Sequence, residues 1–275
     1  MLKNKTKIAI IGGSGFCEFS EMKKTRKIDV MTKYGKPSDK IISGEYADND
    51  ILFLPRHGHD HFLSPDRIPY KANMVALKKL GVEYIVAFCA AGSLNIKISP
   101  GEFVVLDQFV DLTWGRNIIH EKDNTFIHLS PDVPYCEFLR KIVYKEALKL
   151  GIKVHKKGTV AVIQGPRFNT TAESKWFIKQ GWDLVNMTQY PECYFAKELG
   201  LKYVSIAMIT DYDIGLKKYG NTMSFKDIEK TRKIFEKNIA NAKTLIGPVV
   251  KKIAKYKDIY EKDDIHVPYY QKLKT

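Results

Sequence analysis

The sequence KIAIIGGSG at residues 7–15 places the first constraint on the fold. Its Ile-rich beginning predicts a short buried strand, and Gly12 and Gly13 predict a tight turn directly after that strand. Glycines can turn successive backbone N–H groups toward one point, and the hydroxyl of Ser14 would add a donor, so the turn could bind an anion. A plain tight turn is an equal alternative, because the complete GxGxxG spacing of a dinucleotide site is missing.

Similar apolar runs recur along the chain and alternate with segments of helical period. We expect strands at 51–54, 84–88, 103–106, 159–163, 184–187 and 203–209, and helices at 71–80, 135–150, 171–180 and 192–199. A last helix is expected from an N-cap at Ser224 to about Tyr256, interrupted at Gly247–Pro248.

Strands that alternate with helices predict the α/β class, with a central mixed, largely parallel sheet flanked by helices. Such sheets bind ligands at the C-terminal ends of their strands. No repeat or flexible linker interrupts the pattern, so we expect a single domain over residues 1–275. Residues 257–275 would form a C-terminal tail that is loosely ordered or docked on a neighbouring subunit.

Composition excludes several classes of protein. With 44% hydrophobic and 28% charged residues in 275, the chain has enough apolar material for a large core and is unlike a disordered protein. No apolar run approaches the length of a membrane helix, and the first residues lack the features of a signal peptide. We therefore expect a cytoplasmic protein with no membrane partner. The four cysteines show no metal-ligand spacing and are expected to be free thiols, with disulfides open for a hyperthermophilic source.

The formal net charge of +14 suggests a possible nucleic-acid partner. However, the Lys residues are spread singly and in pairs along expected helices, for example over 141–156 and 226–255, as on solvated helix faces. No clustered basic arm or RNA-binding aromatic motif accompanies them. We expect no nucleic-acid partner and attribute part of the positive field to attraction of phosphate or other small anions.

The segment PRHGHDH at 55–61 puts one guanidinium and three imidazoles directly after an expected strand. An anion site is the natural interpretation, because the planar fork of Arg56 can donate two hydrogen bonds to one phosphate. A metal site is the alternative, with ligands drawn from His57, His59, Asp60 and His61.

Two further strand-end segments contain small or aromatic residues. In AAGS at 90–93 the small side chains would let a ligand approach the backbone, or would let a helix pack closely on a strand. In GPRF at 165–168, Arg167 is either a ligand or an ion-pair partner. Phe168 either stacks on a planar base or fills the core, which is the more common fate of an aromatic side chain.

Asp211 and Asp213 alternate after the apolar run at 203–209, so their carboxyl groups can face one edge of a ligand. A purine N7 needs a donor and a 6-amino group needs an acceptor, and one protonated and one ionised carboxyl group could supply both. Magnesium binding is the competing interpretation of this pair.

In this order, the segments GGSG, RHGHDH, AAGSL, GPRF, NMT and TDYD resemble the trimeric purine nucleoside phosphorylase family, in particular its methylthioadenosine phosphorylase branch. The resemblance runs from about Lys7 to Asp213 and includes YGKPSD at 34–39 and ANMVALK at 72–78. It implies a pentosyltransferase that cleaves 5′-methylthioadenosine with inorganic phosphate as co-substrate, without a cofactor or metal, as a homotrimer or homohexamer. A broader purine nucleoside phosphorylase and a non-catalytic nucleoside-binding relative are the alternatives.

The resemblance also implies roles for individual residues. The phosphate-binding positions of the family correspond to Ser14, Arg56, His57, Cys89, Ala90 and Thr188, with His61 close by. Its nucleoside-binding positions correspond to Ala91, Gly92, Phe168, Met187, Asp211 and Asp213, joined by His128 from a neighbouring subunit. Asp211 and Asp213 would be the catalytic pair that stabilises the leaving purine at its N7 and 6-amino edge, and Asp at both positions favours 6-aminopurines because 6-oxopurine members carry Asn there.

Three positions depart from the family pattern. Cys89 replaces a hydroxyl residue that binds phosphate, and a thiol is the weaker donor. Gln164 replaces a Glu before GPRF, and Asn169 replaces a Ser after it. We expect these changes to alter the affinity for phosphate without abolishing activity.

Overall fold

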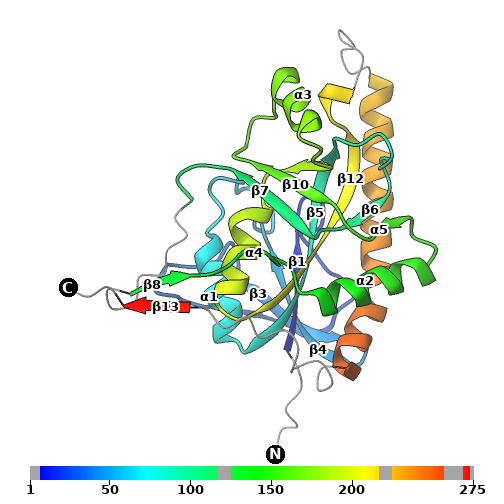
Figure 1. The fold of residues 1–275 in the computed structure, drawn as a ribbon. Coiled ribbons are helices and arrows are strands. Elements are labelled where there is room, and N and C mark those ends of the chain that lie inside the picture. Colours follow the sequence, from blue (N-terminus) through cyan, green and yellow to red (C-terminus); the bar gives the residue numbers. More distant parts are fainter. Residues whose placement is uncertain (1–6, 117–124, 217–224, 257–268, 273–275) are drawn as a thin grey trace, which may run out of the picture.

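The computed structural model describes residues 7–116, 125–216, 225–256 and 269–272, which form the elements drawn in Figure 1. The helices are α1 (Tyr70–Lys79), α2 (Glu137–Lys149), α3 (Thr171–Lys179), α4 (Gln189–Glu198) and α5 (Phe225–Tyr256), with a short 3-10 helix η1 (Ile214–Leu216). The strands are β1 (Lys7–Gly12), β2 (Lys23–Ile28), β3 (Ile41–Tyr46), β4 (Asn49–Pro55), β5 (Val82–Ser93), β6 (Phe103–Val105), β7 (Gln108–Leu112), β8 (Thr125–His128), β9 (Val154–His155), β10 (Thr159–Ile163), β11 (Leu184–Asn186), β12 (Lys202–Tyr212) and β13 (Tyr269–Lys272).

Eleven of these strands form one sheet in the order β2-β3-β4-β1-β5-β11-β10-β7, with β12 paired to β5 and β6, and β6 paired to β9. The pairs β1–β4, β1–β5, β5–β12, β6–β9, β7–β10 and β10–β11 are parallel, and the remaining pairs are antiparallel. The predicted fold class, a mixed and largely parallel sheet with flanking helices, is confirmed.

Each face of the sheet is covered by a pair of helices. On one face α1 and α4 pack together and against the sheet, and Met74 and Phe195 are buried there. On the other face α2 packs against α5, which runs beside β12, and Val143 and Ile246 are buried there. Apolar area removed from water on both faces is the main source of stability for such a sheet, at about 25 cal/mol per Å².

The course of β5 explains where the sheet opens. Along one edge of β5 the strand β1 pairs as far as Ala87, and β11 approaches from the opposite direction and pairs at Gly92 and Ser93. Among the described residues, Phe88–Ala91 therefore have no strand partner on that edge. The C-terminal ends of β1 and β11 converge on this gap, which is the position at which an α/β sheet binds its ligands.

The interruption expected at Gly247–Pro248 is wrong, because α5 continues through it. Proline removes one helical hydrogen bond and costs about 3 kcal/mol in a helix interior. Ile246 and Val249 on either side of the proline are both fully buried against the sheet. Each such side chain contributes about 1.5–3 kcal/mol, so their burial outweighs the cost of the proline.

Several strands were not expected from the sequence. The strand β2 is almost fully exposed, and in β3 only Ile41 and Gly44 are buried, so neither shows a long apolar run. In the expected tail, residues 269–272 form β13, which pairs antiparallel with β8 of the same chain in a separate two-stranded sheet, drawn at the left of Figure 1. The rest of the tail lies outside the described residues.

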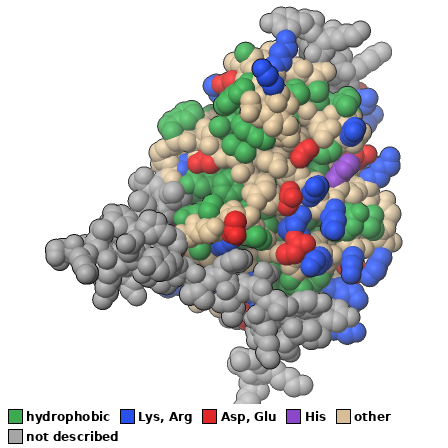
Figure 2. Space-filling view, viewed as in Figure 1, with side chains coloured by type: hydrophobic (Ala, Val, Ile, Leu, Met, Phe, Trp, Pro, Cys, Tyr) green, Lys and Arg blue, Asp and Glu red, His purple; other side chains and the backbone are tan. Residues whose placement is uncertain are grey.

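Charged side chains concentrate on the right-hand side of the view in Figure 2, where α2 and α5 lie. Within these helices, Lys149 pairs with Glu146 of α2, and Lys233 pairs with Glu229 of α5. Such pairs are typical of solvated helix faces. None of the described helices is long and apolar enough to cross a bilayer.

Candidate active site

A cavity of about 910 Å³ opens at the gap beside β5. It is bordered by the segments that follow β1, β4, β10 and β11, by the end of β12 and by the first half of α5. The cavity is lined by His61, which was expected close to the phosphate, and by these members of the predicted phosphate-binding and nucleoside-binding sets: Ser14, Arg56, His57, Ala90, Ala91, Gly92, Phe168, Met187, Thr188, Asp211 and Asp213. Its size is that of a pocket for a small organic molecule.

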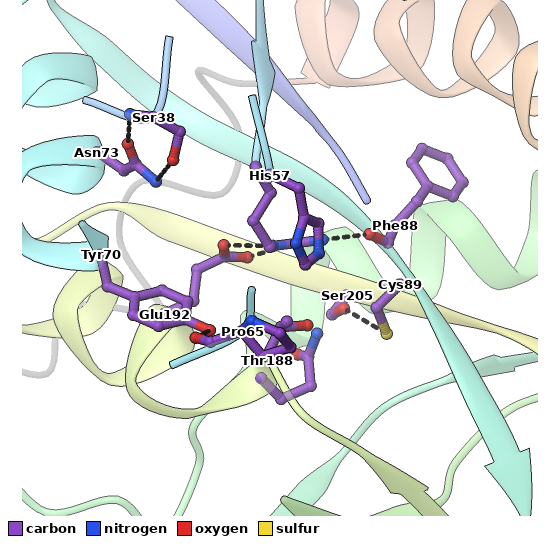
Figure 3. A network of polar contacts seen from close by, with 12 residues as sticks. Ser38, His57, Pro65, Tyr70, Asn73, Phe88, Cys89, Thr188, Glu192 and Ser205 are labelled. Carbon is purple, nitrogen blue, oxygen red and sulfur yellow. Dashed lines mark hydrogen bonds and ion pairs between the residues drawn. The ribbon is translucent and has the colours of Figure 1, made fainter. Parts of the chain in front are cut away.

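Arg56 at the end of β4 is completely buried, and its guanidinium is held from two sides. Its Nε and Nη2 donate to the two carboxylate oxygens of Glu192 on α4, at 2.6 and 2.7 Å, and Nη1 donates to Phe88 O at 2.7 Å. Figure 3 shows the contacts accepted by Glu192 and Phe88. Three of the five guanidinium N–H groups are therefore used by the protein, and two remain for a ligand.

Glu192 is the main residue of the site that sequence reasoning missed. It also accepts a hydrogen bond of 2.6 Å from the buried Tyr203 hydroxyl. Burial alone would lower the pKa of Arg56, but the charge and hydrogen bonds of Glu192 outweigh this effect and raise that pKa. In the sequence, Glu192 is an ordinary charged residue at a helix start, and nothing in its neighbourhood indicates a partner 136 residues earlier.

The Gly-rich turn after β1 makes room for this guanidinium. A side chain at Gly13 would come within 2.8 Å of Arg56 Nη1 and 2.7 Å of Phe88 O. Neither contact could relax easily, because both atoms belong to the buried hydrogen-bonded cluster. Ser14, the next residue, lines the cavity and adds a hydroxyl donor there.

His57 and His61 are the two histidines of the PRHGHDH segment that line the cavity. Their rings lie 4.3 Å apart, and His61 has a backbone φ of +54°, a conformation uncommon for a residue with a side chain. Burial lowers the pKa of His57 to about 4 and also lowers that of His61, so both rings are uncharged at neutral pH. The nearby charge of Arg56 adds to the effect on His57.

His59 and Asp60 are not among the residues that line the cavity. The exposed His59 contacts Asp60 and Glu18, at 3.0 and 2.8 Å, and the first of these contacts is the main reason why its pKa is raised. Among the described residues, no group of three or more His, Cys, Asp or Glu side chains could hold a metal ion. The metal interpretation of PRHGHDH and of the aspartate pair is therefore not supported by the geometry.

Three residues singled out in the sequence lie outside the cavity lining. Cys89 is buried, with its Sγ 3.8 Å from Ser205 Oγ and from Ile206 O, and Figure 3 shows it turned toward Ser205. Its thiol contacts the neighbouring strand β12 there, and its assignment to the phosphate-binding set stays a prediction. Gln164 accepts a hydrogen bond from Trp114 N. Arg167 forms an exposed ion pair with Glu173, as expected for a structural partner.

Asp213 lies at the other end of the cavity and is anchored through one oxygen. Its Oδ1 accepts hydrogen bonds from Asn169 Nδ2, at 2.9 Å, and from the Ser174 hydroxyl. Its Oδ2 lies about 3.6 Å from the point where a Cβ on Gly92 would be. Asn169, a departure from the family pattern, is thus a direct partner of an expected catalytic residue and not of phosphate.

Asp211 also lines the cavity and accepts a hydrogen bond of 2.7 Å from the Thr210 hydroxyl. The pairing of β12 with β5 shifts register between Ile209 and Asp211, which indicates a bulge there. Bulges change the direction of side chains next to functional sites. Here, both aspartates face the same cavity.

Phe168 is 83% exposed although it lines the cavity. The core position, the more common fate for an aromatic side chain, is therefore wrong for this residue. The cis peptide bond between Gly165 and Pro166 and the capping box of α3 at Thr170 define the segment that carries it. An exposed ring at the mouth of a cavity is free to stack on a planar ligand.

Arg116 is a second residue that the sequence did not indicate. Its guanidinium donates to three backbone carbonyls: Met187 O at 2.9 Å, Gln164 O at 2.7 Å and Tyr190 O at 2.5 Å. It also lies over the ring of Tyr70, 5.4 Å from its centre. Arg116 thereby ties the segment after β10 to the segment after β11, and both segments line the cavity.

The predicted role of His128 depends on its side chain, which the structure does not describe. Its backbone belongs to β8, where it pairs with Tyr269 of β13, but its side chain lies outside the described part of the structure. Its contact with a neighbouring subunit stays a prediction.

Comparison with known proteins places this geometry in a family. The model of the phosphorylase superfamily matches residues 7–248. A protein from Pyrococcus abyssi named S-methyl-5′-thioadenosine phosphorylase is 42% identical over 85% of this chain and 91% of its own length. One with the same name from Mycolicibacterium smegmatis is 43% identical, over 87% of this chain and 88% of its own.

Solved structures of similar proteins share the fold. Methylthioadenosine phosphorylase from Schistosoma mansoni in complex with adenine superposes with a TM-score of 0.85 and 35% identity, over 92% of this chain and 94% of that one. A methylthioadenosine phosphorylase from an antarctic soil metagenomic library has the same TM-score and identity, over 93% and 88% of the two chains.

Proposed function

We propose that this chain, which belongs to the phosphorylase superfamily, uses inorganic phosphate to cleave the glycosidic bond of 5′-methylthioadenosine. The products are adenine and 5-methylthioribose 1-phosphate. The observation that carries the proposal is the arrangement of one cavity, with hydrogen-bond donors around Arg56 at one end and the carboxylates of Asp211 and Asp213 at the other.

The separation of these two ends can be read along β5. Phe88 O binds Arg56, and Gly92 lies beside Asp213. Four residues of strand span about 13 Å at roughly 3.3 Å per residue. This length suits a phosphate, a ribose and a purine placed end to end, with Ala90 and Ala91 forming a floor without bulky side chains between them.

At the phosphate end, the free N–H groups of Arg56 and the hydroxyls of Ser14 and Thr188 are the donors. The buried ion pair with Glu192 keeps the guanidinium in one orientation, so that it need not reorganise when the anion binds. Met187 lies next to Thr188 and also lines the cavity, and this position supports a ribose site beside Met187.

At the base end, the purine stacks on Phe168 with its N7 and 6-amino edge toward Asp211 and Asp213. The reaction begins with lengthening of the bond between C1′ and N9, and the ribosyl group gains oxocarbenium character. Phosphate held on the opposite face of the ribose then bonds to C1′. Positioning of the phosphate and a hydrogen bond to the leaving purine supply the rate enhancement, and one well-placed hydrogen bond contributes on the order of a hundredfold.

The relatives named S-methyl-5′-thioadenosine phosphorylase support the choice of substrate. One observation keeps a broader purine nucleoside phosphorylase as the second candidate. Thr231 and Arg232 of α5 line the cavity, and both present polar groups. A polar surface accommodates the 5′-hydroxyl of adenosine better than an apolar one does.

The proposal also covers the co-substrate, the oligomeric state and the location of the enzyme. Inorganic phosphate is a co-substrate and no cofactor takes part, since cavity residues can supply every group that the reaction needs. A homotrimer or homohexamer would bring His128 of one subunit to the cavity of the next. The four cysteines form no disulfide bonds, which agrees with a cytoplasmic location.

The experiment that tests the function is a phosphorolysis assay with 5′-methylthioadenosine, adenosine, inosine and guanosine, each with and without phosphate. We expect adenine from 5′-methylthioadenosine at the highest kcat/KM, with strict dependence on phosphate. The variant Arg56→Lys tests the phosphate end of the cavity. It keeps the positive charge but loses the planar guanidinium, and should raise KM for phosphate at least about tenfold.

Two outcomes would replace the proposal by an alternative. Comparable kcat/KM values for inosine and guanosine would identify a broader purine nucleoside phosphorylase. Binding of adenine nucleosides without phosphate-dependent release of adenine would identify a non-catalytic nucleoside-binding relative.

A further inference from the structure

The ring of His57 is held in one tautomer by the backbone. Its Nδ1 lies 2.8 Å from Leu63 O. A carbonyl oxygen only accepts hydrogen bonds, so Nδ1 carries the proton and donates it. Because burial keeps the ring uncharged at neutral pH, the other nitrogen, Nε2, has a lone pair and no proton.

Nε2 is therefore a hydrogen-bond acceptor beside the N–H donors of Arg56 and the hydroxyls of Ser14 and Thr188, which can donate or accept. It has no hydrogen-bond partner among the described residues, and His57 lines the cavity next to Arg56. The charge of Arg56 is already balanced by Glu192. The anion site thus combines a neutral ion pair, several donors and a fixed acceptor at Nε2, and a bound anion that carries a proton can satisfy that acceptor.

We propose that His57 makes the site selective for an oxyanion that carries a hydroxyl group, with the P–OH of hydrogen phosphate donating to Nε2. The inference rests on the proposed function for the identity of the anion as phosphate. Donors alone bind any tetrahedral dianion, whereas an acceptor at Nε2 repels one that has no proton. The hydrogen bond also fixes which phosphate oxygen is protonated, and leaves the other three for the donors and for attack on C1′.

The test compares two dianions of similar size, hydrogen phosphate and fluorophosphate, in which fluorine replaces the hydroxyl. Binding of each is measured by calorimetry without nucleoside at about pH 8, above the second pKa of phosphate. We expect the protein to bind hydrogen phosphate at least about tenfold more tightly, because an unpaired buried acceptor costs that much in affinity. His57→Gln should reduce the preference to about twofold or less, since its side-chain amide can turn to donate.

His59→Gln is the matched control, because His59 lies outside the cavity and the same substitution there should leave the preference unchanged. If His57→Gln does not fold, nitrogen-15 NMR of the unaltered protein gives a second measurement. An unprotonated Nε2 whose signal moves on binding hydrogen phosphate, and not fluorophosphate, supports the inference.

Equal affinity for the two anions, or a protonated Nε2 in the free protein, would overturn it. Failure of the proposed function gives a different result, in which hydrogen phosphate binds with the expected preference but no nucleoside is cleaved.

Discussion

The guanidinium of Arg56 and the carboxylate of Glu192 form a two-pronged ion pair, at 2.6 and 2.7 Å, in which neither side chain is exposed to solvent. Glu192→Gln leaves a buried cation without its counter-charge. Breaking a buried pair in this way costs about 3–5 kcal/mol of unfolding free energy. We expect urea unfolding to show this loss, and KM for phosphate to rise because the guanidinium is no longer held in place.

The chain contains a matched control for this prediction. Glu173 forms a similar two-pronged pair with Arg167, but on the surface. Glu173→Gln keeps the capping box of α3, since Gln serves there as well as Glu, and should cost about 1 kcal/mol or less. Equal losses of unfolding free energy in the two variants would show that burial does not make the Arg56 pair more important for stability than the surface pair.

Arg116 joins two segments of the cavity wall through their carbonyl groups, at Met187 and Gln164. Lysine keeps the charge but cannot reach all of these acceptors, so Arg116→Lys should loosen the wall. We expect kcat/KM for the nucleoside to fall about tenfold and the unfolding free energy to fall by about 1–3 kcal/mol.

Arg140→Lys provides the comparison. Arg140 also donates to backbone carbonyls, of Leu106 and Lys156, but none of these residues lines the cavity. It should show a similar loss of stability with unchanged kinetic constants. A kinetic defect of the same size in both variants would mean that Arg116 acts only through overall stability.

The sequence predicted the parts of the site that depend on local pattern. Strand-end segments with small or charged residues, such as 90–93, lie at the cavity because parallel strands bring their C-terminal ends to one edge. Glu192 and Arg116 could not be predicted, because their partners are distant in sequence or are backbone carbonyls that carry no side-chain signal.

The same limit explains the errors in the fold. Pro248 is a strong local signal for a helix break, and only the burial of its neighbours against the sheet overrides that signal. For Phe168, stacking on a base and a core position were both open, and the core position, the more common fate of an aromatic residue, is wrong because exposure depends on the packing of the segment that carries the residue and not on residue type. Local preference fails at both positions because tertiary contacts decide the outcome.

His57 makes the stability of the protein dependent on pH. Burial holds its pKa in the folded state at about 4, against an ordinary value of 6.5, and the facing groups Arg56 and His61 act in the same direction. The unfolded chain therefore takes up a proton near pH 6.5 that the folded protein does not bind until about pH 4. The free energy of unfolding falls as the pH is lowered through this window, by about 3 kcal/mol at most.

Denaturant unfolding of the protein and of His57→Gln at several values between pH 7.5 and pH 4 measures this contribution. The variant cannot titrate at position 57, so its stability should fall less steeply. Parallel curves for the two proteins would show that folding does not lower the pKa of His57.

Phe168 should affect substrate binding more than stability. Its ring is 83% exposed, so Phe168→Ala should change the unfolding free energy by less than about 0.5 kcal/mol. Stacking of a base on an aromatic ring contributes about 1–3 kcal/mol, so KM for the nucleoside should rise about tenfold or more. Ile96→Ala, at a residue that is 65% exposed and outside the cavity, should change neither quantity. An unchanged KM in Phe168→Ala would place the base elsewhere.

Asp213→Asn should change which purine the enzyme prefers. Because Oδ1 of Asp213 accepts hydrogen bonds from Asn169 and Ser174, the amide oxygen of the new Asn must take that position. The amide nitrogen then replaces Oδ2 beside Gly92 and turns an acceptor into a donor. A 6-amino group loses its partner, and a 6-oxo group gains one.

The ratio of kcat/KM for inosine to that for adenosine should therefore rise roughly a hundredfold, one hydrogen bond being lost on one substrate and gained on the other. Asp183→Asn is the control, since Asp183 also accepts two hydrogen bonds, from Asn95 and Thr159, but does not line the cavity. It should lower stability and leave the ratio unchanged. If the ratio stays constant in Asp213→Asn as well, the 6-position of the purine does not face Asp213, and Asp211 alone must recognise that edge.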